Sequence, residues 1–331
     1  MDARLVEIEA PRRYMSVNWQ VNNFCNYECS YCNPGNWLGD HRNEGNLDVY
    51  IRNLGYMISR YEQADYKYFK FFFSGGEPTA WKNFIPICEW LRERVPDCTI
   101  AVNTNLSRPL GWWEKHHHLF DDIVASFHVE FCDKDAYEEK SIYLCDKVNY
   151  LSSKMLMHDE RFWEVVEFGE HLKTVMPNYF IEWTPLFDEM SVNTGPWQYN
   201  DADKEEFINT HSCEMQFTID KPYSENNCVS YATYEDGLSN PANSNDIIIA
   251  KQNFFKGWEC DIGDAIFIGP TGSISLASCG QSGTVGHILE DVTEIAPQSI
   301  ICDKYHCHCG TDIIIPKRRV SEEEVIAVGS D

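Results

Sequence analysis

The sequence has no long apolar run and no excess of basic charge. No stretch of about 18 consecutive apolar residues occurs, so no membrane-spanning helix is expected. Residues 1–13 are of mixed charge and lack the apolar segment of a secretory signal. The 331 residues include 27 Lys and Arg against 52 Asp and Glu, which gives a formal net charge of −25. Because such an acidic surface repels phosphate backbones, we expect no nucleic-acid partner. Because an apolar run and a secretory signal are both missing, we expect a cytoplasmic protein with no membrane partner.

Cysteine, in contrast, is abundant, with fourteen residues in the chain. In a reducing compartment, clustered cysteines indicate metal binding or catalysis more often than disulfides. Six of them are scattered singly, and we interpret these mainly as small buried hydrophobic residues. The other eight form two groups, which are Cys25, Cys29 and Cys32, and then Cys260, Cys279, Cys302, Cys307 and Cys309.

Residues 16–186 alternate between short β-rich runs and segments in which apolar residues recur at helical spacing. The predicted strands are Ser16–Val21, Tyr68–Phe73, Thr99–Thr104, Asp122–Val129, Val148–Leu156 and Phe180–Leu186. The predicted helices between them include Leu47–Gln63, Trp81–Val95 and Arg161–Val175. Such alternation implies a parallel sheet with right-handed crossovers. We therefore predict an α/β fold class, a partial (β/α)6 TIM-like barrel over residues 1–196, with its chemistry at the carboxyl ends of the strands.

The character of the sequence changes after Pro196. Residues 197–256 are polar and predict a linker with an inserted hairpin, in which Gln216–Asp220 and Ile247–Ala250 are β-like. Residues 257–331 contain glycines, β-branched residues and the second cysteine group, which predicts a small β-rich cluster-binding domain.

Two local patterns stand out in residues 257–331. Asp261–Ser278 is predicted to form a β-hairpin around Gly269-Pro270-Thr271-Gly272. The basic run Lys317-Arg318-Arg319 is followed closely by three glutamates, and we interpret it as the solvated start of a helix.

Cys25, Cys29 and Cys32 lie within eight residues, directly after the first predicted strand. Three thiolates on one loop can face one point and ligate a soft metal centre. Structural zinc requires four ligands, and the next cysteine is Cys88. A [4Fe–4S] cluster held by three thiolates leaves one iron open, and an open position indicates a catalytic site.

A second motif, Ser74-Gly75-Gly76-Glu77-Pro78, ends the next predicted strand. Its two glycines let the backbone approach a ligand closely, and Glu77 supplies a carboxylate there. A structural Gly-Gly turn is the alternative interpretation. The co-occurrence with the cysteine loop favours a binding site.

Together, the C-x3-C-x2-C loop and the G-G-E-P segment resemble the radical S-adenosylmethionine (SAM) superfamily over roughly residues 14–190. The resemblance implies that Cys25, Cys29 and Cys32 hold three irons of a [4Fe–4S] cluster, whose fourth iron binds SAM. It also implies that Gly75, Gly76, Glu77 and Pro78 hydrogen-bond the methionine amino group and that Tyr31 lies near the adenine. The positional candidates for the SAM carboxylate and ribose are Thr104, Asn105, Ser126 and His128. His128 is as readily interpreted as a core histidine.

The activity that this resemblance implies is reductive cleavage of SAM to methionine and a 5′-deoxyadenosyl radical, which abstracts hydrogen from an unactivated carbon. The cofactor carries the difficult chemistry, and the protein binds, orients and excludes solvent. An external electron donor such as flavodoxin or ferredoxin is implied as a partner.

The second cysteine group offers four or five ligands for another centre, because Cys260 and Cys279 flank the predicted hairpin. Structural zinc is an alternative occupant. The segment resembles the SPASM or twitch extension of radical SAM enzymes, which opens with C-x(9–15)-G-x4-C and binds auxiliary [4Fe–4S] clusters. Eleven residues between Cys260 and Gly272 fit that pattern, whereas six residues between Gly272 and Cys279 depart from it. We expect one auxiliary cluster, with one of the five thiols spare or only three used.

The leading hypothesis is an oxidoreductase-type radical SAM enzyme that abstracts a hydrogen and oxidatively modifies a small molecule or peptide with help from the auxiliary cluster. A second hypothesis is redox-neutral rearrangement or epimerisation, in which Cys132 or Cys228 returns the hydrogen. A third, from another class, is a non-catalytic zinc-binding module.

Overall fold

The computed structural model describes residues 3–39, 45–176, 179–186, 198–211, 229–290, 292, 294–307 and 309–320. These residues form two compact units that do not follow the order of the chain. We call the part that lies within Trp19–Leu47 and Phe71–Glu225 the sheet unit. The terminal unit lies within Met1–Asn18, Asp48–Lys70 and Asn226–Asp331.

The sheet unit is built on parallel strands that follow one another in chain order. Their bounds are β2 (Tyr14–Gln20), β3 (Tyr68–Ser74), β4 (Thr99–Thr104), β5 (Asp122–Phe127), β6 (Tyr150–Leu156) and β7 (Phe180–Thr184), of which β2 and β3 end in this unit. From β4 to β7 every pairing is parallel, with Ala101 opposite Asp122 and Ser152 opposite Phe180. The prediction of a mixed α/β fold with a parallel sheet is therefore confirmed. Closure of this sheet into a partial barrel stays a prediction.

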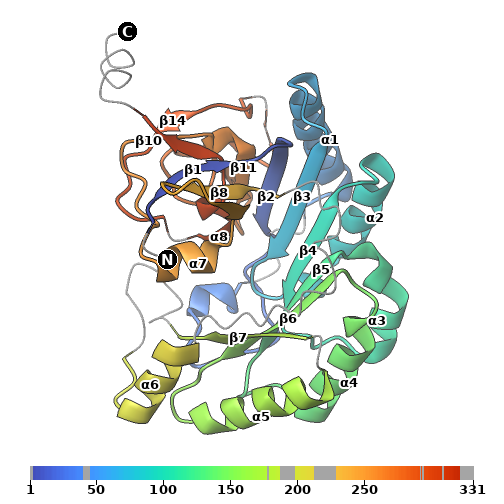
Figure 1. The fold of residues 1–331 in the computed structure, drawn as a ribbon. Coiled ribbons are helices and arrows are strands. Elements are labelled where there is room, and N and C mark those ends of the chain that lie inside the picture. The colour runs from blue at the N-terminus through green and yellow to red at the C-terminus, as the bar shows by residue number, and fades with distance from the viewer. Residues whose placement is uncertain are drawn as a thin grey trace. The chain divides into compact units, whose positions relative to one another are not determined.

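Helices connect the successive parallel strands. They are α2 (Phe84–Arg94), α3 (Leu110–His116), α4 (Lys134–Cys145) and α5 (Phe162–Val175), and α6 (Ala202–His211) follows β7. Figure 1 shows α2 to α5 along the outer side of the strands. Short 3-10 turns occur at η1 (Pro34–Asn36), η2 (Pro78–Ala80) and η3 (His117–Leu119).

The core of the sheet unit forms where the helices pack on the strands. Phe127 on β5 lies 5.3 Å from the ring of Tyr137 on α4 and 4.6 Å from that of Phe168 on α5, measured between ring centroids. Phe127 and Tyr137 are fully buried. For α5, the apolar spacing that predicted the helix is therefore the spacing that covers the sheet.

The terminal unit contains an antiparallel sheet in the order β14-β10-β15-β1-β8-β9. Its strands are β1 (Leu5–Glu9), β8 (Tyr231–Tyr234), β9 (Ser239–Pro241), β10 (Trp258–Cys260), β14 (Ile300–Ile301) and β15 (Lys317–Arg319). A further set comprises β11 (Ala265–Ile268), β12 (Ser273–Leu276) and β13 (Gly286–His287). The helical elements are α1 (Leu47–Gln63), α7 (Ser244–Ile249), η5 (Ile262–Asp264) and α8 (Gly310–Ile313).

Two local predictions in the terminal unit are confirmed. Helix α1 has the predicted bounds, Leu47–Gln63, and it buries Leu54, Met57 and Ile58 at helical spacing. The predicted hairpin within Asp261–Ser278 forms from β11 and β12, which pair antiparallel with Ile268 opposite Ile274.

Two other predictions are wrong, one for Ile247–Ala250 and one for Lys317–Arg319. Ile247–Ala250 was predicted to be β-like, but Ile247 lies in helix α7, where its amide donates to the carbonyl of Asn243 at 3.2 Å. A short apolar run fits a buried helix as well as a strand, so periodicity could not separate the two. The β-like segment Gln216–Asp220 lies outside the described residues.

Lys317–Arg319 forms strand β15 rather than a solvated helix start. The strand pairs with β1 on one side and β10 on the other, and the side chain of Lys317 is buried. These long-range partners outweigh the local charge pattern on which the prediction was based. Among the described residues, no helix has the length and apolar character needed to cross a bilayer.

Candidate functional site

The three-cysteine loop and the Gly-Gly-Glu-Pro segment are hydrogen-bonded to each other through their backbones. The amide of Gly76 donates to the carbonyl of Asn22 at 3.1 Å, and the amide of Glu77 donates to that of Phe24 at 2.8 Å. Cys25 follows Phe24 directly. The two motifs that were predicted to act together therefore meet where β2 and β3 end.

Gly75 is required by this close approach. Its φ is +133°, and a Cβ at this position would lie 2.6 Å from the carbonyl oxygen of Asn22. A side chain would therefore push the segment away from the cysteine loop.

Glu77 is the buried hub of the segment, with 1% of its surface exposed. Its Oε1 accepts from the backbone amide of Thr79 at 3.0 Å, from the Thr79 hydroxyl at 2.7 Å and from the Thr104 hydroxyl at 2.8 Å. Its Oε2 accepts from the amide of Asn105 at 2.8 Å. Burial raises the pKa of Glu77, and these hydrogen bonds oppose that rise. The carboxylate joins the end of β3 to the end of β4 and so positions Thr104 and Asn105, two of the predicted site residues.

Asn105 brings the end of β4 to the first cysteine. Its Nδ2 lies 3.7 Å from Cys25 Sγ and donates to Asn26 Oδ1 at 3.1 Å. The backbone amide of Tyr27 also points at Cys25 Sγ, at 3.4 Å. Burial raises the pKa of the Cys25 thiol to about 11, and the Tyr27 and Asn105 hydrogen bonds lower it. A sulfur that receives two donors is suited to hold negative charge as a metal-bound thiolate.

Cys29 is buried beside His128, one of the predicted site residues. The Sγ atom lies 3.4 Å from His128 Nδ1, and the hydroxyl of Tyr31 lies 2.7 Å from the same nitrogen. Burial raises the pKa of Cys29 to about 12 and lowers the pKa of His128 to about 4. His128 is therefore a neutral imidazole near pH 7, stacked on the Tyr31 ring at 6.1 Å.

Ser126 does not join this group by any contact of its own side chain in the described residues, because its hydroxyl donates to Asn103 Oδ1 at 2.9 Å. Ser126 lies near the end of β5, the strand that directly precedes His128. The third cysteine, Cys32, donates its backbone amide to the carbonyl of Cys29 at 3.0 Å, which folds the loop back on itself.

Glu130 and His158 also contact the cysteine loop, and sequence reasoning missed both. Glu130 Oε2 accepts from the backbone amide of Ser30 at 2.9 Å, and Glu130 Oε1 lies 3.5 Å from His158 Nε2. His158 follows the end of β6, and its ring packs edge-on against Tyr31. Their place just after strands five and six was a usable signal, because function gathers at strand ends in such sheets.

Cys132, a candidate hydrogen donor, lies beside Tyr27 of the cysteine loop, whose hydroxyl interacts with the thiol. Burial raises the pKa of Cys132 to about 12, so this thiol keeps its proton near pH 7. The other candidate, Cys228, lies outside the described residues.

Four of the five C-terminal cysteines line one cavity in the terminal unit, which we call the thiol cavity. They are Cys260, Cys279, Cys302 and Cys307. Cys260 ends β10, Cys302 follows β14, and the amide of Cys302 donates to the carbonyl of Trp258 at 2.8 Å. Secondary structure thus brings together thiols that are distant in sequence.

Burial governs the acidity of these thiols. It raises the pKa of Cys260 to about 11 and that of Cys307 to about 12, while the charge of Lys317 lowers both. Burial also raises the pKa of Cys279, and charge on Cys302 raises it further. The thiols are therefore close enough to influence one another electrostatically.

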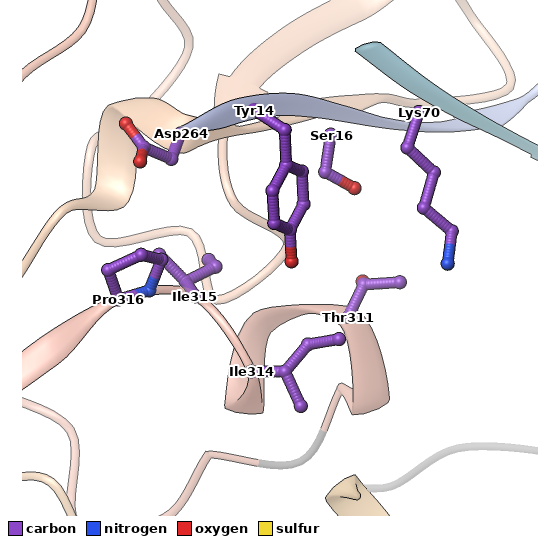
Figure 2. Close-up of a pocket in the computed structure, with 8 residues that line it drawn as sticks. All are labelled: Tyr14, Ser16, Lys70, Asp264, Thr311, Ile314, Ile315 and Pro316. Carbon is purple, nitrogen blue, oxygen red and sulfur yellow. The ribbon is translucent and has the colours of Figure 1, made fainter. Parts of the chain in front are cut away.

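Cys309 stands apart from the thiol cavity. Its Sγ contacts the hydroxyl of Thr311 at 2.9 Å and lies 3.9 Å from Asn18 Nδ2. Thr311, at the start of α8, lines a different small cavity together with Tyr14 and Lys70, as Figure 2 shows. The side chain of Cys309 is thus engaged on this other side of α8.

The two cysteine groups fit the groups expected at them in different ways. The cysteines of both groups are buried or half-buried, and four of the C-terminal group line one cavity; thiols are the donors that iron–sulfur clusters use. Within the described residues, no three His, Cys, Asp or Glu side chains converge closely enough to hold a single metal ion. A cubane cluster has an iron at each of several corners, so its thiolates lie farther apart than the ligands of one ion.

Comparison with known proteins finds sequence relatives for part of the chain. A GTP 3′,8-cyclase of Pasteurella multocida (strain Pm70) is 25% identical over 107 residues, and one of Edwardsiella ictaluri (strain 93-146) is 29% identical over 107 residues. Each match spans 31% of this chain and 31% of the relative. Both relatives are radical SAM enzymes. The chain resembles radical SAM enzymes. No family model matches it.

Several solved structures align with most of the chain at low sequence identity. BtrN in complex with AdoMet and 2-DOIA has 13% identity and a TM-score of 0.39, covering 83% of this chain and 78% of that one. Native anSMEcpe with bound AdoMet has 13% identity and a TM-score of 0.49, covering 85% and 80%. Streptococcus suis SuiB bound to the precursor peptide SuiA has 12% identity and a TM-score of 0.43, covering 81% and 60%. Because these TM-scores are below 0.5, no conclusion is drawn from them.

Proposed function

We propose that this chain is a radical SAM enzyme that cleaves SAM reductively and modifies its substrate by hydrogen abstraction. The observation that carries the proposal is the backbone hydrogen bonding of the Gly75–Pro78 segment to Asn22 and Phe24, directly before the Cys25–Cys32 loop, at the ends of β2 and β3. A purely structural Gly-Gly turn would not require a loop of three thiols beside it. When bound, the reduced cluster and SAM supply the 5′-deoxyadenosyl radical.

The chain's own residues bind and orient these groups. Cys25, Cys29 and Cys32 hold the cluster and leave its fourth position to SAM. Asn105 donates toward Cys25 Sγ, and His128 contacts Cys29 Sγ, so each sulfur has a polar neighbour that fixes its direction.

The residues around SAM follow from the same geometry. Gly75 lets the Gly75–Pro78 backbone lie against the loop, where it is positioned to bind the methionine amino group. The candidates for the remaining SAM contacts are Tyr31, Thr104, Asn105, Ser126 and His128. Thr104 is held in place by Glu77, and Tyr31 by His128. Tyr27 and Phe131 stack at 5.5 Å and add an apolar surface beside the cysteine loop.

The thiol cavity supports an oxidative outcome. We propose that Cys260, Cys279, Cys302 and Cys307 hold an auxiliary [4Fe–4S] cluster in which every iron has a protein ligand. A fully ligated cluster has no open position for substrate and serves as an acceptor of the electron that the substrate radical loses. The substrate is a small molecule or a peptide, and flavodoxin or ferredoxin supplies the first electron.

A redox-neutral reaction is the second candidate, because Cys132 lies next to Tyr27 of the cluster loop and keeps its proton. A hydrogen donor must carry the S–H hydrogen that it returns to the substrate radical. The two candidates differ in electron balance. Oxidation releases an electron pair from each substrate molecule, whereas rearrangement or epimerisation releases none, and Cys132→Ala would abolish only the latter.

The test of the proposal is the metal content and the SAM cleavage of anaerobically purified, reconstituted protein. We expect about eight irons per chain, and formation of 5′-deoxyadenosine with dithionite and SAM. Cys29→Ala is expected to lose about four irons and all SAM cleavage. Cys145→Ala, a half-exposed cysteine of α4, is the matched control and should lose neither. Protein that binds zinc but no iron would contradict the proposal. About four irons with one zinc would keep the radical site and replace the auxiliary cluster with a structural ion.

A further inference from the structure

Lys317 is a buried cation in the wall of the thiol cavity. It lines that cavity together with the four cysteines, and only 5% of its surface is exposed. On strand β15 it is the register partner of Cys260 on β10. A lysine is almost never buried to this degree without a partner for its charge.

The contacts of Lys317 within the protein do not neutralise it. Its Nζ donates to the backbone carbonyl of Asp312 at 2.7 Å and lies 4.3 Å from the centroid of the Phe255 ring. A carbonyl and an aromatic face solvate an ammonium group but carry no net charge. Among the described residues, Lys317 forms no ion pair with a carboxylate. The groups that can balance its charge are the cysteines, once they are thiolates, and the buried carboxyl of Asp312, whose pKa the charge of Lys317 lowers.

The cavity wall also holds Lys304, His306 and Asp312. Lys304 and His306 are exposed, so water screens them. Asp312 is buried, its Oδ2 accepts from the amide and hydroxyl of Ser278 at 2.9 and 2.7 Å, and burial raises its pKa. Among the described lining residues, Lys317 is thus the buried cation.

Lys317 is buried, whereas the two cations that follow it on β15 are not. Arg318 and Arg319 are exposed, and Arg318 forms a surface ion pair with Glu259 at 2.6 Å. One strand therefore carries three consecutive cations, of which only Lys317 faces the thiols.

We propose that Lys317 is a positioning residue that sets the reduction potential of the auxiliary cluster, an inference that rests on the proposed function of the thiol cavity. Four thiolates give the site a net negative charge, and each electron that the cluster accepts adds another. A fixed positive charge in a low-dielectric wall favours the reduced form and raises the potential. It also favours thiolate over thiol, which is the form that binds iron.

The experiment uses the full-length chain with the Cys29→Ala substitution, so that only the auxiliary cluster contributes to the signal. Its midpoint potential is measured by redox titration with electron paramagnetic resonance detection, next to the iron content. Lys317→Met, which keeps length and apolar character, is expected to shift the ratio of reduced to oxidised cluster about tenfold at fixed potential, or about 59 mV downward for one electron. Arg318→Met removes a charge one residue away and should leave the potential unchanged.

The outcomes separate this inference from the proposal beneath it. Equal potentials in Lys317→Met and Arg318→Met, with iron bound in both, would overturn the role of Lys317 and leave the auxiliary cluster standing. If Lys317→Met loses its iron, Lys317→Arg decides, because a role of charge predicts that arginine restores the cluster and a role of packing predicts that it does not. If the Cys29→Ala chain with native Lys317 holds no iron, the auxiliary cluster itself is absent.

Discussion

The cysteine loop of the sheet unit and the thiol cavity of the terminal unit hold similar ligands in different ways. In the loop, Cys25, Cys29 and Cys32 lie within eight residues, and their remaining neighbours are side chains such as Asn105 and His128. In the cavity, four thiols come from segments spread over 48 residues, from Cys260 to Cys307.

The difference indicates how the arrangement of the cysteine ligands favours an open or a closed cluster. Three ligands on one short loop cannot surround a cubane, so the fourth side faces the ends of β3, β4 and β5, where SAM is proposed to bind. The proposed ligands of the auxiliary cluster lie at the end of β10, after β14 and in two loops, so they would surround a cluster and leave no side for a substrate. The first arrangement suits chemistry at the metal, and the second suits electron transfer.

Removing ligands from the thiol cavity is the strongest way to test this comparison. The double variant Cys260→Ala and Cys279→Ala is expected to lose about four irons and keep SAM cleavage, because the loop does not depend on these thiols. Iron content and 5′-deoxyadenosine formation measure the two effects separately. Loss of SAM cleavage in a soluble, folded double variant would show that the two regions do not act as separate sites. Cys88→Ala together with Cys98→Ala, two buried cysteines outside both groups, controls for the number of substitutions.

The two units should also respond differently to pH, because the terminal unit buries Asp264. Its carboxyl accepts from Tyr66 and pairs with Arg13 at 3.0 Å, yet burial raises its pKa from 3.8 to about 6. The folded chain thus holds this proton more tightly than the unfolded chain does. The resulting stability is fully present below about pH 3.8 and is lost as the pH rises through about 6, by up to about 3 kcal/mol.

Denaturant unfolding of the native chain and of Asp264→Asn between pH 4 and 7 measures this contribution. The difference in free energy of unfolding between the two proteins should change over that range. Asp261→Asn, at a half-exposed neighbour that also approaches Arg13, should change it little. A pH-independent difference for Asp264→Asn would mean that the carboxyl is ionised throughout, with the Arg13 charge outweighing burial.

Glu77→Gln tests whether the loop side is held by its buried carboxylate. In the native chain, donors such as the amide of Asn105 contact a carboxylate oxygen of Glu77. Glutamine keeps one of the two oxygens and replaces the other with an NH2 group, which is itself a donor. One buried donor is left without an acceptor, which costs about 2 kcal/mol of unfolding free energy. We also expect weaker SAM binding, because Thr104 and Asn105 lose their anchor. The exposed residue Glu93 of α2 provides the matched control, Glu93→Gln, and equal stability of the two variants would contradict the role of Glu77.

The comparison also shows which features could be predicted from the sequence. The strand and helix pattern of the sheet unit is local, so period alone located β4 at Thr99–Thr104, as it also located α1 at Leu47–Gln63 in the terminal unit. The three-cysteine loop and the Gly75–Pro78 motif were found because their spacing is contained in a few residues. Their direct hydrogen bonding, from Gly76 to Asn22, depends on strand register and could not be read from spacing.

The terminal unit was harder because its contacts are long-range. Strand β15 lies between β1 and β10, which are separated from it by about 310 and 57 residues in the chain, so the burial of Lys317 has no local signal. Likewise, the spacing of the five C-terminal cysteines did not indicate which of them points away from the thiol cavity. The direction of the Cys309 side chain depends on where α8 begins. A helix of four residues is too short to be predicted from periodicity.

Cys309→Ser is the smallest expected effect and the sharpest test of that assignment. The thiol of Cys309 contacts Thr311 and approaches Asn18, away from the thiol cavity, and a hydroxyl can make the same polar contacts. We therefore expect an unchanged iron content and an unchanged spectrum of the auxiliary cluster in Cys309→Ser. Cys307→Ser, only two residues earlier, should lose the cluster or convert it to one with an open iron, because Cys307 lines the cavity. If the two variants exchanged these results, Cys309 would be the fourth ligand, α8 would have to begin in another orientation, and Cys307 would be the spare thiol.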